Sequence, residues 1–334
     1  MDLKKILIVG LGSIGLKHLR IAREIFPESI IGVLRHKKTN EVTADADKIF
    51  FDLSQALKFQ PQIAIICSPA SEHVKISSAL VGQGVHVLIE RPISDNQKGL
   101  EELNCKAIKN NCVLAVGYNL RFLPSLMKFK NLIDKNLIGN AYSVRSEVGQ
   151  YLPNWRKTDY RDSVSAKKIL GGGVLLELSH ELDYLRWIFG EVESVQAEIG
   201  HQSKLEIDVE DTAHIILKFK ESKNKSNLVA SLNLDFIRHD KARICHVIGG
   251  KGTLRWNGLT GDIDLFEPDK TKWKNIYKYK MDQDGSYKDE WLHFIDCINK
   301  KITPKISFQD GIKVLNIIES IKIASSSGKK VLVK

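Results

Sequence analysis

The sequence predicts a protein of the α/β class, in which a doubly wound parallel sheet is followed by a second α/β domain. Aliphatic runs alternate with helical patterns over the first 120 residues, and 6–9 is typical of a strand buried on both faces of a sheet. A glycine-rich turn follows this strand. After about residue 120 the pattern changes to strands with an apolar residue at every second position.

The composition is ordinary for a globular protein, and 334 residues are enough for two domains. No segment has the roughly 20 apolar residues of a membrane span, and no signal segment precedes the first strand, so we expect a cytoplasmic protein without a membrane partner. The five cysteines contain no C-x-x-C pair, which argues against a zinc site or a disulfide framework. We therefore expect no bound metal.

The formal net charge is +10, but the lysines are scattered along the chain. A solvated surface explains them better than a nucleic-acid face, because charge alone reports on solubility and non-specific binding. Attraction of an anionic cofactor or substrate would use the same charge. We expect no nucleic-acid partner.

Gly10, Gly12 and Gly15 fall on the spacing G-x-G-x-x-G, with Ser13 and Ile14 inside the motif, and 16–25 reads as a helix. After a strand, such glycines allow a tight turn, close approach of a pyrophosphate and packing of the helix on the strand. The anion would lie at the helix N-terminus. The motif indicates a dinucleotide site, although a merely structural turn would carry the same glycines.

The second strand, 29–34, ends at Arg35, His36 and Lys37. In a dinucleotide fold the residue at this strand end meets the adenosine ribose, and an acid there accepts from the 2′-hydroxyl of NAD. Cations suit a 2′-phosphate instead, so the pattern favours NADP over NAD. An exposed basic loop would look the same.

Strands at 48–50, 62–66, 85–89 and 112–116, with helices at 52–58 and 100–109, complete the first domain. Loops at the carboxyl ends of such strands hold the ligand in a doubly wound sheet. His73, in one of these loops, is either a ligand contact or a surface histidine. The other candidate cofactor contacts in these loops are Cys67, Ser68, Pro69, Glu90, Arg91, Asn119 and Arg121.

The second part is expected to hold a sheet with strands at 141–148, 192–199, 213–219, 228–236, 242–248 and 253–256. Hairpin turns are expected at 220–227 and 249–252, and helices at 125–135, 289–299 and 310–325. Residues 215–217 place apolar side chains on both faces of the sheet, so an uncovered face is a candidate interface between copies of the chain.

Five segments carry a resemblance: the glycine motif, S-P at 68–69, E-R-P at 90–92, G-Y-N-L-R-F at 117–122, and GGG…H-x-x-D at 171–183. With them the chain resembles the glucose–fructose oxidoreductase, inositol dehydrogenase and rhizopine-catabolism family (Gfo/Idh/MocA) over essentially its whole length. The resemblance implies a Rossmann domain at 1–120 and an α/β domain with an open, mainly antiparallel sheet at 121–334. It also implies a homodimer or homotetramer that uses a pyridine nucleotide to oxidise or reduce a sugar, sugar phosphate, nucleotide sugar or cyclitol.

Residues 171–187 read as a helix after three glycines, in which Glu177, His180 and Asp183 recur every three residues. Such a polar stripe is either solvated or catalytic, because a carboxylate beside a histidine is how a general base is oriented. By the resemblance, His180 takes the family's histidine position, Arg91 a lysine position and Glu177 an aspartate position. Arginine cannot act as a base, so we expect His180 to remove the hydroxyl proton and Arg91 to stabilise the resulting oxygen.

The segment 151–161 is rich in aromatic and basic residues and resembles the family's substrate-side loop. Arg156, Tyr160 and Arg161 could meet a phosphate or carboxylate there, although an ordinary surface loop is equally compatible. Tyr118 and Asp183 complete the candidate substrate contacts.

Two other functions share these motifs. One is a non-catalytic sensor of nucleotide or sugar, because a fold does not guarantee turnover. The other is a lyase or hydrolase that uses transient oxidation by NAD.

Overall fold

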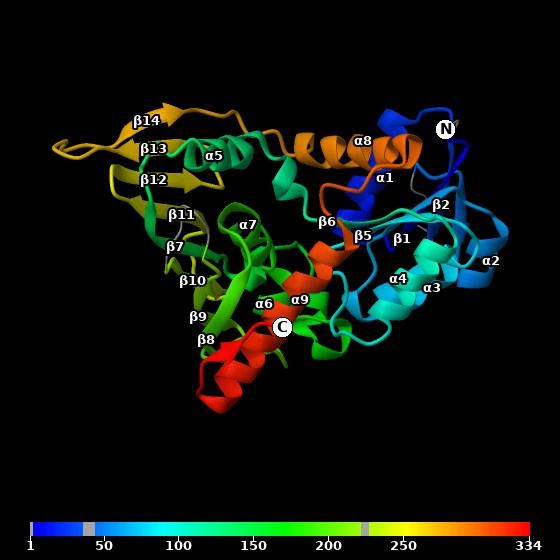
Figure 1. The fold of residues 1–334 in the computed structure, drawn as a ribbon. Helices are drawn as coiled ribbons and strands as arrows, with labels where there is room; N and C mark the ends of the chain where they lie inside the picture. Colours follow the sequence, from blue (N-terminus) through cyan, green and yellow to red (C-terminus); the bar gives the residue numbers. More distant parts are fainter. Residues whose placement is uncertain (1–2, 36–43, 222–226) are drawn as a thin grey trace. The chain divides into compact units, whose positions relative to one another are not determined.

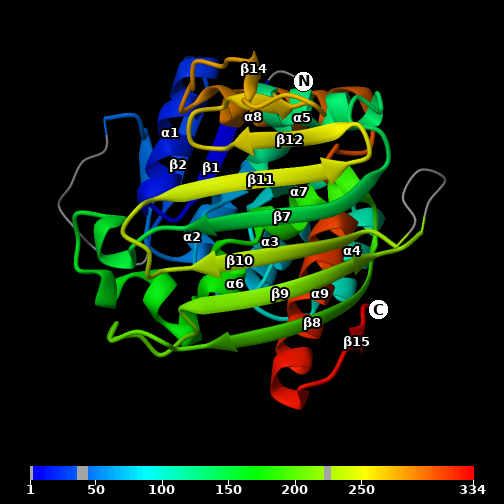
Figure 2. The same cartoon turned by 90° about the vertical axis from the view of Figure 1, so that its left-hand side faces the viewer.

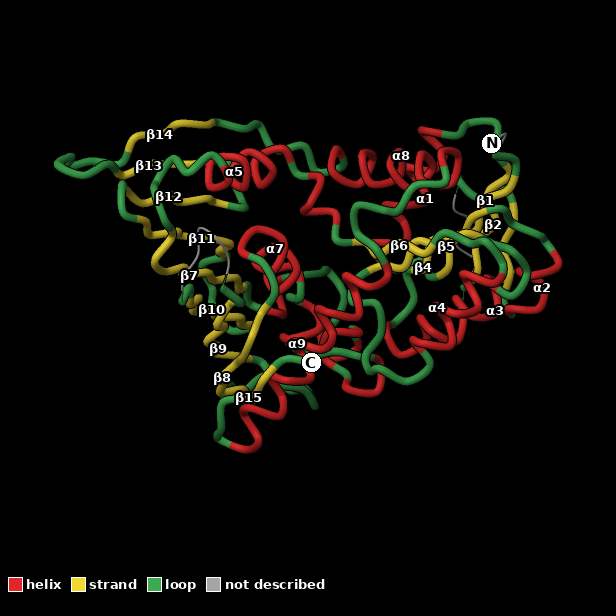
Figure 3. The backbone as a smooth tube through the Cα atoms, in the orientation of Figure 1, coloured by secondary structure: helices red, strands yellow, loops and turns green. Residues whose placement is uncertain are grey.

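The computed structural model describes residues 3–35, 44–221 and 227–334 (Figure 1). The chain divides into two compact units, of which the first comprises Met1–Asn119 and Asp284–Leu315 and the second Leu120–Gln283 and Asn316–Lys334. The described strands of each unit gather into one sheet (Figure 3). Among the described residues, no helix is both long and apolar enough to cross a membrane.

The first unit is built on a parallel sheet whose six described strands follow the order β3-β2-β1-β4-β5-β6. The strands are β1 (Lys5–Val9), β2 (Ile30–Leu34), β3 (Lys48–Phe50), β4 (Ile63–Ile66), β5 (His86–Glu90) and β6 (Leu114–Gly117). Central residues such as Ile6, Leu7 and Ile8 are fully buried, which explains why the strands read as unbroken aliphatic runs. The predicted doubly wound sheet is confirmed.

The helices of this unit pack on the sheet or on one another. They are α1 (Ser13–Ile25), α2 (Leu53–Lys58), α3 (His73–Val81), which follows the short helix η1 (Ala70–Glu72), α4 (Leu100–Lys109) and α8 (Gly285–Lys300). Trp291 and Phe294 of α8 share one buried cluster with Ile6 and Leu19, so α8 belongs to the core of this unit. The sequence predicted a helix here but not that it joins the first unit.

The second unit contains a mixed sheet whose nine described strands follow the order β14-β13-β12-β11-β7-β10-β9-β8-β15 (Figure 2). The strands are β7 (Ala141–Gly149), β8 (Val192–Gly200), β9 (Thr212–Phe219), β10 (Val229–Asp235), β11 (Ala242–Gly249), β12 (Gly252–Asn257), β13 (Ile263–Phe266), β14 (Lys274–Tyr277) and β15 (Val331–Leu332). β7 and β10 pair in parallel, while the other described pairs are antiparallel, which confirms a mainly antiparallel sheet. The sequence did not predict β13, β14 or β15, because strands of two to four residues are too short to establish a period.

The helices α5 (Pro124–Asp134), α6 (Val174–Glu177) and α7 (His180–Phe189) lie on one face of this sheet, and the other face is open in Figure 2. α9 (Phe308–Ser327) begins in the first unit and ends in the second. The short helices are η2 (Asn119–Phe122), η3 (Leu152–Asn154), η4 (Tyr160–Asp162), η5 (Val164–Ala166) and η6 (Lys168–Leu170).

The open face carries single apolar residues between polar ones. In β9, Ile215 and Leu217 are buried, whereas Ile216 is 43% exposed. The neighbouring strands place Arg145 and Asn233 on the exposed side. The expected apolar face is therefore more polar than the sequence suggested, and self-association stays a prediction.

Candidate active site

Two of the three glycines of the motif have a steric reason within the protein. Gly10 has a φ of +90°, and a Cβ there would lie 2.7 Å from the carbonyl oxygen of Cys67. A Cβ on Gly15 would collide with the carbonyl oxygen of Gly10. Around Gly12, by contrast, an added Cβ would meet no described atom within 4 Å. A side chain at residue 12 would meet no obstacle within the protein, so this position is open to the close approach of a ligand.

The N-terminus of α1 suits an anion. The N-cap residue is Gly12, which has no side chain to bond the first helical amides, and the first turn holds no acidic residue. Gly12 and Ser13 are both exposed. Free amides and the helix dipole attract a phosphate at such an end.

This turn lies where the strand order reverses, between β1 and β4. The N–H of Cys67 donates to the carbonyl of Val9 at 2.7 Å, and the N–H of Gly10 donates to the carbonyl of Leu34 at 2.8 Å. The ends of β1, β2 and β4 are thereby joined, which places Arg35 beside the glycine turn. Ligands of doubly wound sheets bind at such a switch point.

Of the three basic residues expected at the end of β2, the structure describes only Arg35. Arg35 is half-buried, and its N–H donates to the carbonyl of Phe50 at 3.0 Å. His36 and Lys37 lie outside the described residues. The preference for NADP therefore stays a prediction.

The loop after β4 contains an orphaned hydroxyl. The Oγ of Ser68 is buried and has no hydrogen-bond partner among the described residues, which fits a site where a ligand supplies the partner. Burial, together with the carboxylates of Glu90 and Glu290, raises the pKa of the Cys67 thiol well above its usual range, so Cys67 is not a nucleophile. Pro69 is the N-cap residue of η1.

His73 is only 1% exposed, so the expectation of a surface histidine is wrong. Its Nδ1 lies 2.9 Å from the carbonyl oxygen of Pro92, and its Nε2 lies 2.8 Å from that of Ser68. Burial lowers the pKa of His73. The ring thus joins the loops after β4 and β5, and both of its nitrogens are occupied by backbone rather than open to a cofactor.

Glu90 is held by protein groups on both carboxylate oxygens. Its Oε1 lies 2.8 Å from Nε2 of His18, and its Oε2 accepts from the N–H of Arg91 at 3.1 Å. The indole N–H of Trp291 donates to Nδ1 of His18 at 2.8 Å. The bond from Arg91 to Pro92 is cis. Both carboxylate oxygens are thus engaged by protein groups, and the expected contact of Glu90 with the cofactor stays a prediction.

Four further expected contacts are buried in the protein. The Nδ2 of Asn119 donates to Oγ of Ser286 at 2.8 Å, and Tyr118 is 0% exposed. Arg121 and Asp183 form a buried bidentate ion pair with N···O distances of 2.9 and 2.6 Å. The charges of Arg121 and Asp183 neutralise each other away from the surface. The cofactor and substrate contacts expected of these four residues stay predictions.

The stretch predicted as a single helix at 171–187 forms two. α6 ends at Glu177 and α7 begins at His180, so the chain bends between them. The spacing of three residues therefore does not place Glu177, His180 and Asp183 on one helical face, and the predicted stripe is wrong. The solvated alternative is wrong as well, because the residues from His180 to Arg186 are all buried.

Glu177 is held by the loop that precedes the glycines. The hydroxyl of Ser165 donates to Oε2 of Glu177 at 2.9 Å, and the N–H of Gly173 donates to the carbonyl of Ser165 at 3.1 Å. His180, on the other side of the bend, is 8% exposed. Glu177 and His180 thus lie on different helices, with two residues between them.

Glu210, in the loop between β8 and β9, meets the same glycines, and no motif in the sequence indicates it. Its Oε1 accepts from the N–H of Leu175 at 3.1 Å, and its carbonyl accepts from the N–H of Val174 at 3.2 Å. A Cβ on Gly173 would collide with its carboxylate. Burial raises the pKa of Glu210.

The loop at 151–161 holds two arginines that were expected to meet a substrate, of which Arg156 is exposed and Arg161 is engaged in ion pairs. Arg161 is paired with Asp159 at 2.6 Å and with Glu206 at 3.3 Å, so its charge organises the loop. The hydroxyl of Tyr160 accepts from the N–H of Glu206 at 3.2 Å and keeps its own proton to donate. Arg156 is exposed, without a hydrogen bond or ion pair of its side chain among the described residues. Arg156 and Tyr160 stay candidates for substrate contact.

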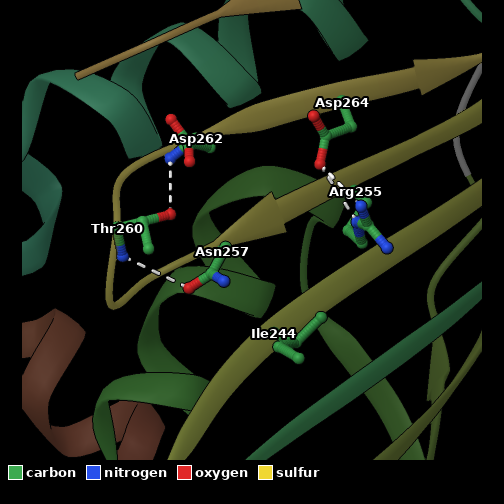
Figure 4. Close-up of a pocket in the computed structure, with 6 residues that line it drawn as sticks. All are labelled: Ile244, Arg255, Asn257, Thr260, Asp262 and Asp264. Atoms are coloured by element: carbon green, nitrogen blue, oxygen red, sulfur yellow. Dashed lines mark hydrogen bonds and ion pairs between the residues drawn. The ribbon is translucent and has the colours of Figure 1, made fainter. Parts of the chain in front are cut away.

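The described residues contain no group of three or more His, Cys, Asp or Glu arranged to hold a metal ion. The open sheet face bears a hollow of about 290 Å³ in which Arg255 pairs with Asp264 at 2.8 Å (Figure 4). Its other lining residues are Ile244, Asn257, Thr260 and Asp262. None of these six residues is a predicted site residue.

Two family models match the chain: "Oxidoreductase family, NAD-binding Rossmann fold" at residues 4–118 and "Oxidoreductase family, C-terminal alpha/beta domain" at 130–333. The chain belongs to the Gfo/Idh/MocA oxidoreductase family. Within this family, the uncharacterized oxidoreductase YrbE of Bacillus subtilis is 24% identical, covering 98% of this chain and 96% of its own. The myo-inositol 2-dehydrogenase of Thermotoga maritima is 25% identical, covering 91% of both chains.

Solved structures share the fold at lower identity. A levoglucosan dehydrogenase in complex with NADH and levoglucosan has a TM-score of 0.84 at 18% identity, covering 99% of both chains. The WlbA dehydrogenase of Bordetella pertussis in complex with NADH and UDP-GlcNAcA has a TM-score of 0.82 at 19% identity, covering 100% of this chain and 99% of its own. These likenesses confirm the Gfo/Idh/MocA fold in both units.

Proposed function

We propose that this chain is an NAD(P)-dependent dehydrogenase or reductase that acts on a secondary alcohol or ketone of a sugar-like substrate. The observation that carries the proposal is the glycine turn at the switch point, where Gly12 faces open space at an uncapped helix N-terminus. The first unit, which includes Asp284–Leu315, then serves as the dinucleotide-binding domain, and the second unit serves as the substrate-binding and oligomerisation domain.

The residues at this turn fit a dinucleotide. The amides at Gly12 and Ser13 would hold the pyrophosphate, the hydroxyl of Ser68 would gain its missing partner, and Arg35 would lie toward the ribose. When bound, the nicotinamide accepts or supplies the hydride. The protein provides the proton chemistry and the orientation.

His180 is the proposed general base. In the oxidising direction it takes the proton from the substrate hydroxyl at an imidazole nitrogen, and in the reducing direction it returns that proton to the oxygen. Arg91 donates hydrogen bonds to the oxygen while negative charge develops on it. Glu177, held by Ser165, acts on the orientation of the site rather than on the proton itself.

The relatives support a sugar-like substrate. Besides the myo-inositol 2-dehydrogenase, a glucose-6-phosphate 3-dehydrogenase of Bacillus subtilis is 26% identical over 79% of this chain. The ligands named for the solved neighbours are levoglucosan and UDP-GlcNAcA. We infer that this chain takes a polyol or sugar ring of the same kind, with Arg156 and Tyr160 toward any anionic group.

The test is hydride transfer with myo-inositol, glucose 6-phosphate, levoglucosan and UDP-GlcNAcA, each with NAD and with NADP. Turnover should appear with one member of the panel, and His180→Ala should lower its rate about a hundred- to ten-thousandfold and remove an ionisation from the pH profile. His201→Ala, at an exposed loop position, is the matched control. An unchanged rate and pH profile in His180→Ala would place the base elsewhere, with Tyr160 next.

Arg91 is tested separately. Arg91→Lys keeps a charge but replaces a planar fork with a point donor, so the rate should fall while substrate still binds. Arg91→Ala should lower the rate further. Equal rates for the two variants would contradict a role for the cation. Tight cofactor binding without net turnover of any alcohol would instead favour the sensor, or the lyase or hydrolase that uses transient oxidation.

The preference for NADP is tested by calorimetry with both oxidised cofactors. We expect tighter binding of NADP, and loss of that preference in Arg35→Ala, because the guanidinium would pair with the 2′-phosphate. Equal or tighter binding of NAD, or an unchanged preference in the variant, would refute the proposal.

A further inference from the structure

We propose that Glu90 is a positioning residue for Arg91, and that His18 and Trp291 lock its carboxylate in place. The inference rests on the proposed function, because it concerns the cation assigned to the reacting oxygen. It adds three residues to that site, two of which belong to no motif.

The three residues form one chain of buried hydrogen bonds. The indole N–H of Trp291 donates to Nδ1 of His18 at 2.8 Å, and Nε2 of His18 lies 2.8 Å from Oε1 of Glu90. The other oxygen, Oε2, accepts from the backbone N–H of Arg91 at 3.1 Å. His18 and Trp291 are 0% exposed and Glu90 is 7% exposed, so water does not compete for these bonds.

The hydrogen bonds from Trp291 to His18 and from His18 to Glu90 have the same direction of donation. An indole nitrogen can only donate, so Nδ1 of His18 must be the acceptor and carry no proton. The proton of the neutral ring is therefore on Nε2, which donates to Glu90. Both oxygens of Glu90 then act as acceptors, one toward His18 and one toward Arg91. Reversing the donor and acceptor in one of these hydrogen bonds therefore requires the same reversal in the next.

The residues that hold Glu90 in place come from separate helices. His18 lies on α1, the helix whose N-terminus begins at the glycine turn, and Trp291 lies on α8. On the far side of Arg91, the carbonyl of Pro92 is in contact with His73 of α3 at 2.9 Å. The backbone around Arg91 is thus fixed from both sides, so its position is tied to the helix that would hold the pyrophosphate.

Glu90→Gln separates this role from simple packing, because glutamine has the same shape. If its carbonyl faces His18, its NH₂ group meets the N–H of Arg91. If it is turned over, the NH₂ group faces Nε2 of His18, whose proton must move to Nδ1 and there meets the indole N–H of Trp291. One pair of donors collides in either orientation.

Trp291→Phe removes the second collision. In the double variant Glu90→Gln/Trp291→Phe, His18 can carry its proton on Nδ1 and accept from the glutamine, whose carbonyl again accepts from Arg91. A second mutation in the core should therefore restore what the first one lost. Damage to packing alone would instead add up.

Two measurements need no substrate. In ¹⁵N-histidine-labelled wild-type protein, NMR should show His18 protonated at Nε2 and not at Nδ1. By hydrogen exchange, the Arg91 amide should exchange about tenfold faster in Glu90→Gln, the loss of about one buried hydrogen bond. The exchange should slow again in the double variant. Glu102→Gln, at an exposed position of α4, is the matched control.

NADH titration and turnover complete the test. Glu90→Gln should bind NADH as the wild type does but lower kcat about ten- to a hundredfold, and the double variant should regain part of that loss. A proton on Nδ1 in the wild type, unchanged Arg91 exchange in Glu90→Gln, or a double variant no slower in exchange than Glu90→Gln would overturn the proposal. Should Glu90→Gln not fold, the wild-type tautomer and the double variant decide. A wild type that binds NADH but turns nothing over would count against the proposed function alone.

Discussion

Replacing Gly12 and Gly15 by alanine in turn separates a ligand contact from a folding requirement. A Cβ on Gly12 meets nothing within 4 Å, and the backbone there has a φ of −70°, which alanine adopts readily. A Cβ on Gly15 collides with the carbonyl oxygen of Gly10. Gly12→Ala should therefore lose cofactor affinity and keep its stability, whereas Gly15→Ala should lose stability.

The magnitudes follow from these contacts. For Gly12→Ala, alanine is a poorer N-cap but restricts the unfolded chain, so we expect a net change in the free energy of unfolding of less than about 1 kcal/mol. Its methyl group would displace a phosphate from the backbone amides. Losing one or two hydrogen bonds to a charged group costs about 3 kcal/mol, or roughly a hundredfold in cofactor affinity.

Gly15→Ala should cost about 1–3 kcal/mol of stability or more, because two backbone segments must move apart. The assay is thermal unfolding without ligand, followed by calorimetric titration with NADH and NADPH. The reasoning would be refuted if Gly12→Ala bound both cofactors as tightly as the wild type. It would also be refuted if Gly12→Ala lost as much stability as Gly15→Ala.

Three further predictions follow from burial and charge. Burial raises the pKa of Glu210 above its ordinary value of 4.5, so the stability that protonated Glu210 contributes is present below pH 4.5 and is lost as the pH rises through the raised pKa. Glu210→Gln should not show this loss of stability in unfolding curves recorded across that pH range. Parallel pH dependences in the variant and the wild type would contradict the assignment. Asp183→Ala should lower the free energy of unfolding by about 3–5 kcal/mol in denaturant titrations because it strands the buried charge of Arg121, whereas reduced turnover at full stability would restore Asp183 as a substrate contact. We expect self-association through the open sheet face, so light scattering should show a dimer or tetramer that Ile216→Glu weakens, and a monomeric wild type at micromolar concentration would refute this interface.

The sequence alone determined the parallel sheet, the glycine turn and most strands of the second sheet. These features depend on local rules: aliphatic runs for strands buried on both faces, alternation for half-buried strands, and glycine where a Cβ cannot fit. Gly10 illustrates the last rule, because its φ of +90° is a property of the turn itself. The segments of the family resemblance are local in the same sense.

Only the tertiary structure decided how the side chains of the candidate site are used. Trp291 reaches His18 across 273 positions, and Arg121 reaches Asp183 across 62, so no local pattern could reveal either partnership. The sequence of a motif does not show whether a charged side chain meets a ligand or a buried residue of opposite charge. The bend between Glu177 and His180 was hidden for a similar reason, since spacing predicts a shared face only while one helix continues. Packing between distant elements determines which residues become partners, because a buried polar group must be satisfied by the groups that the fold brings to it.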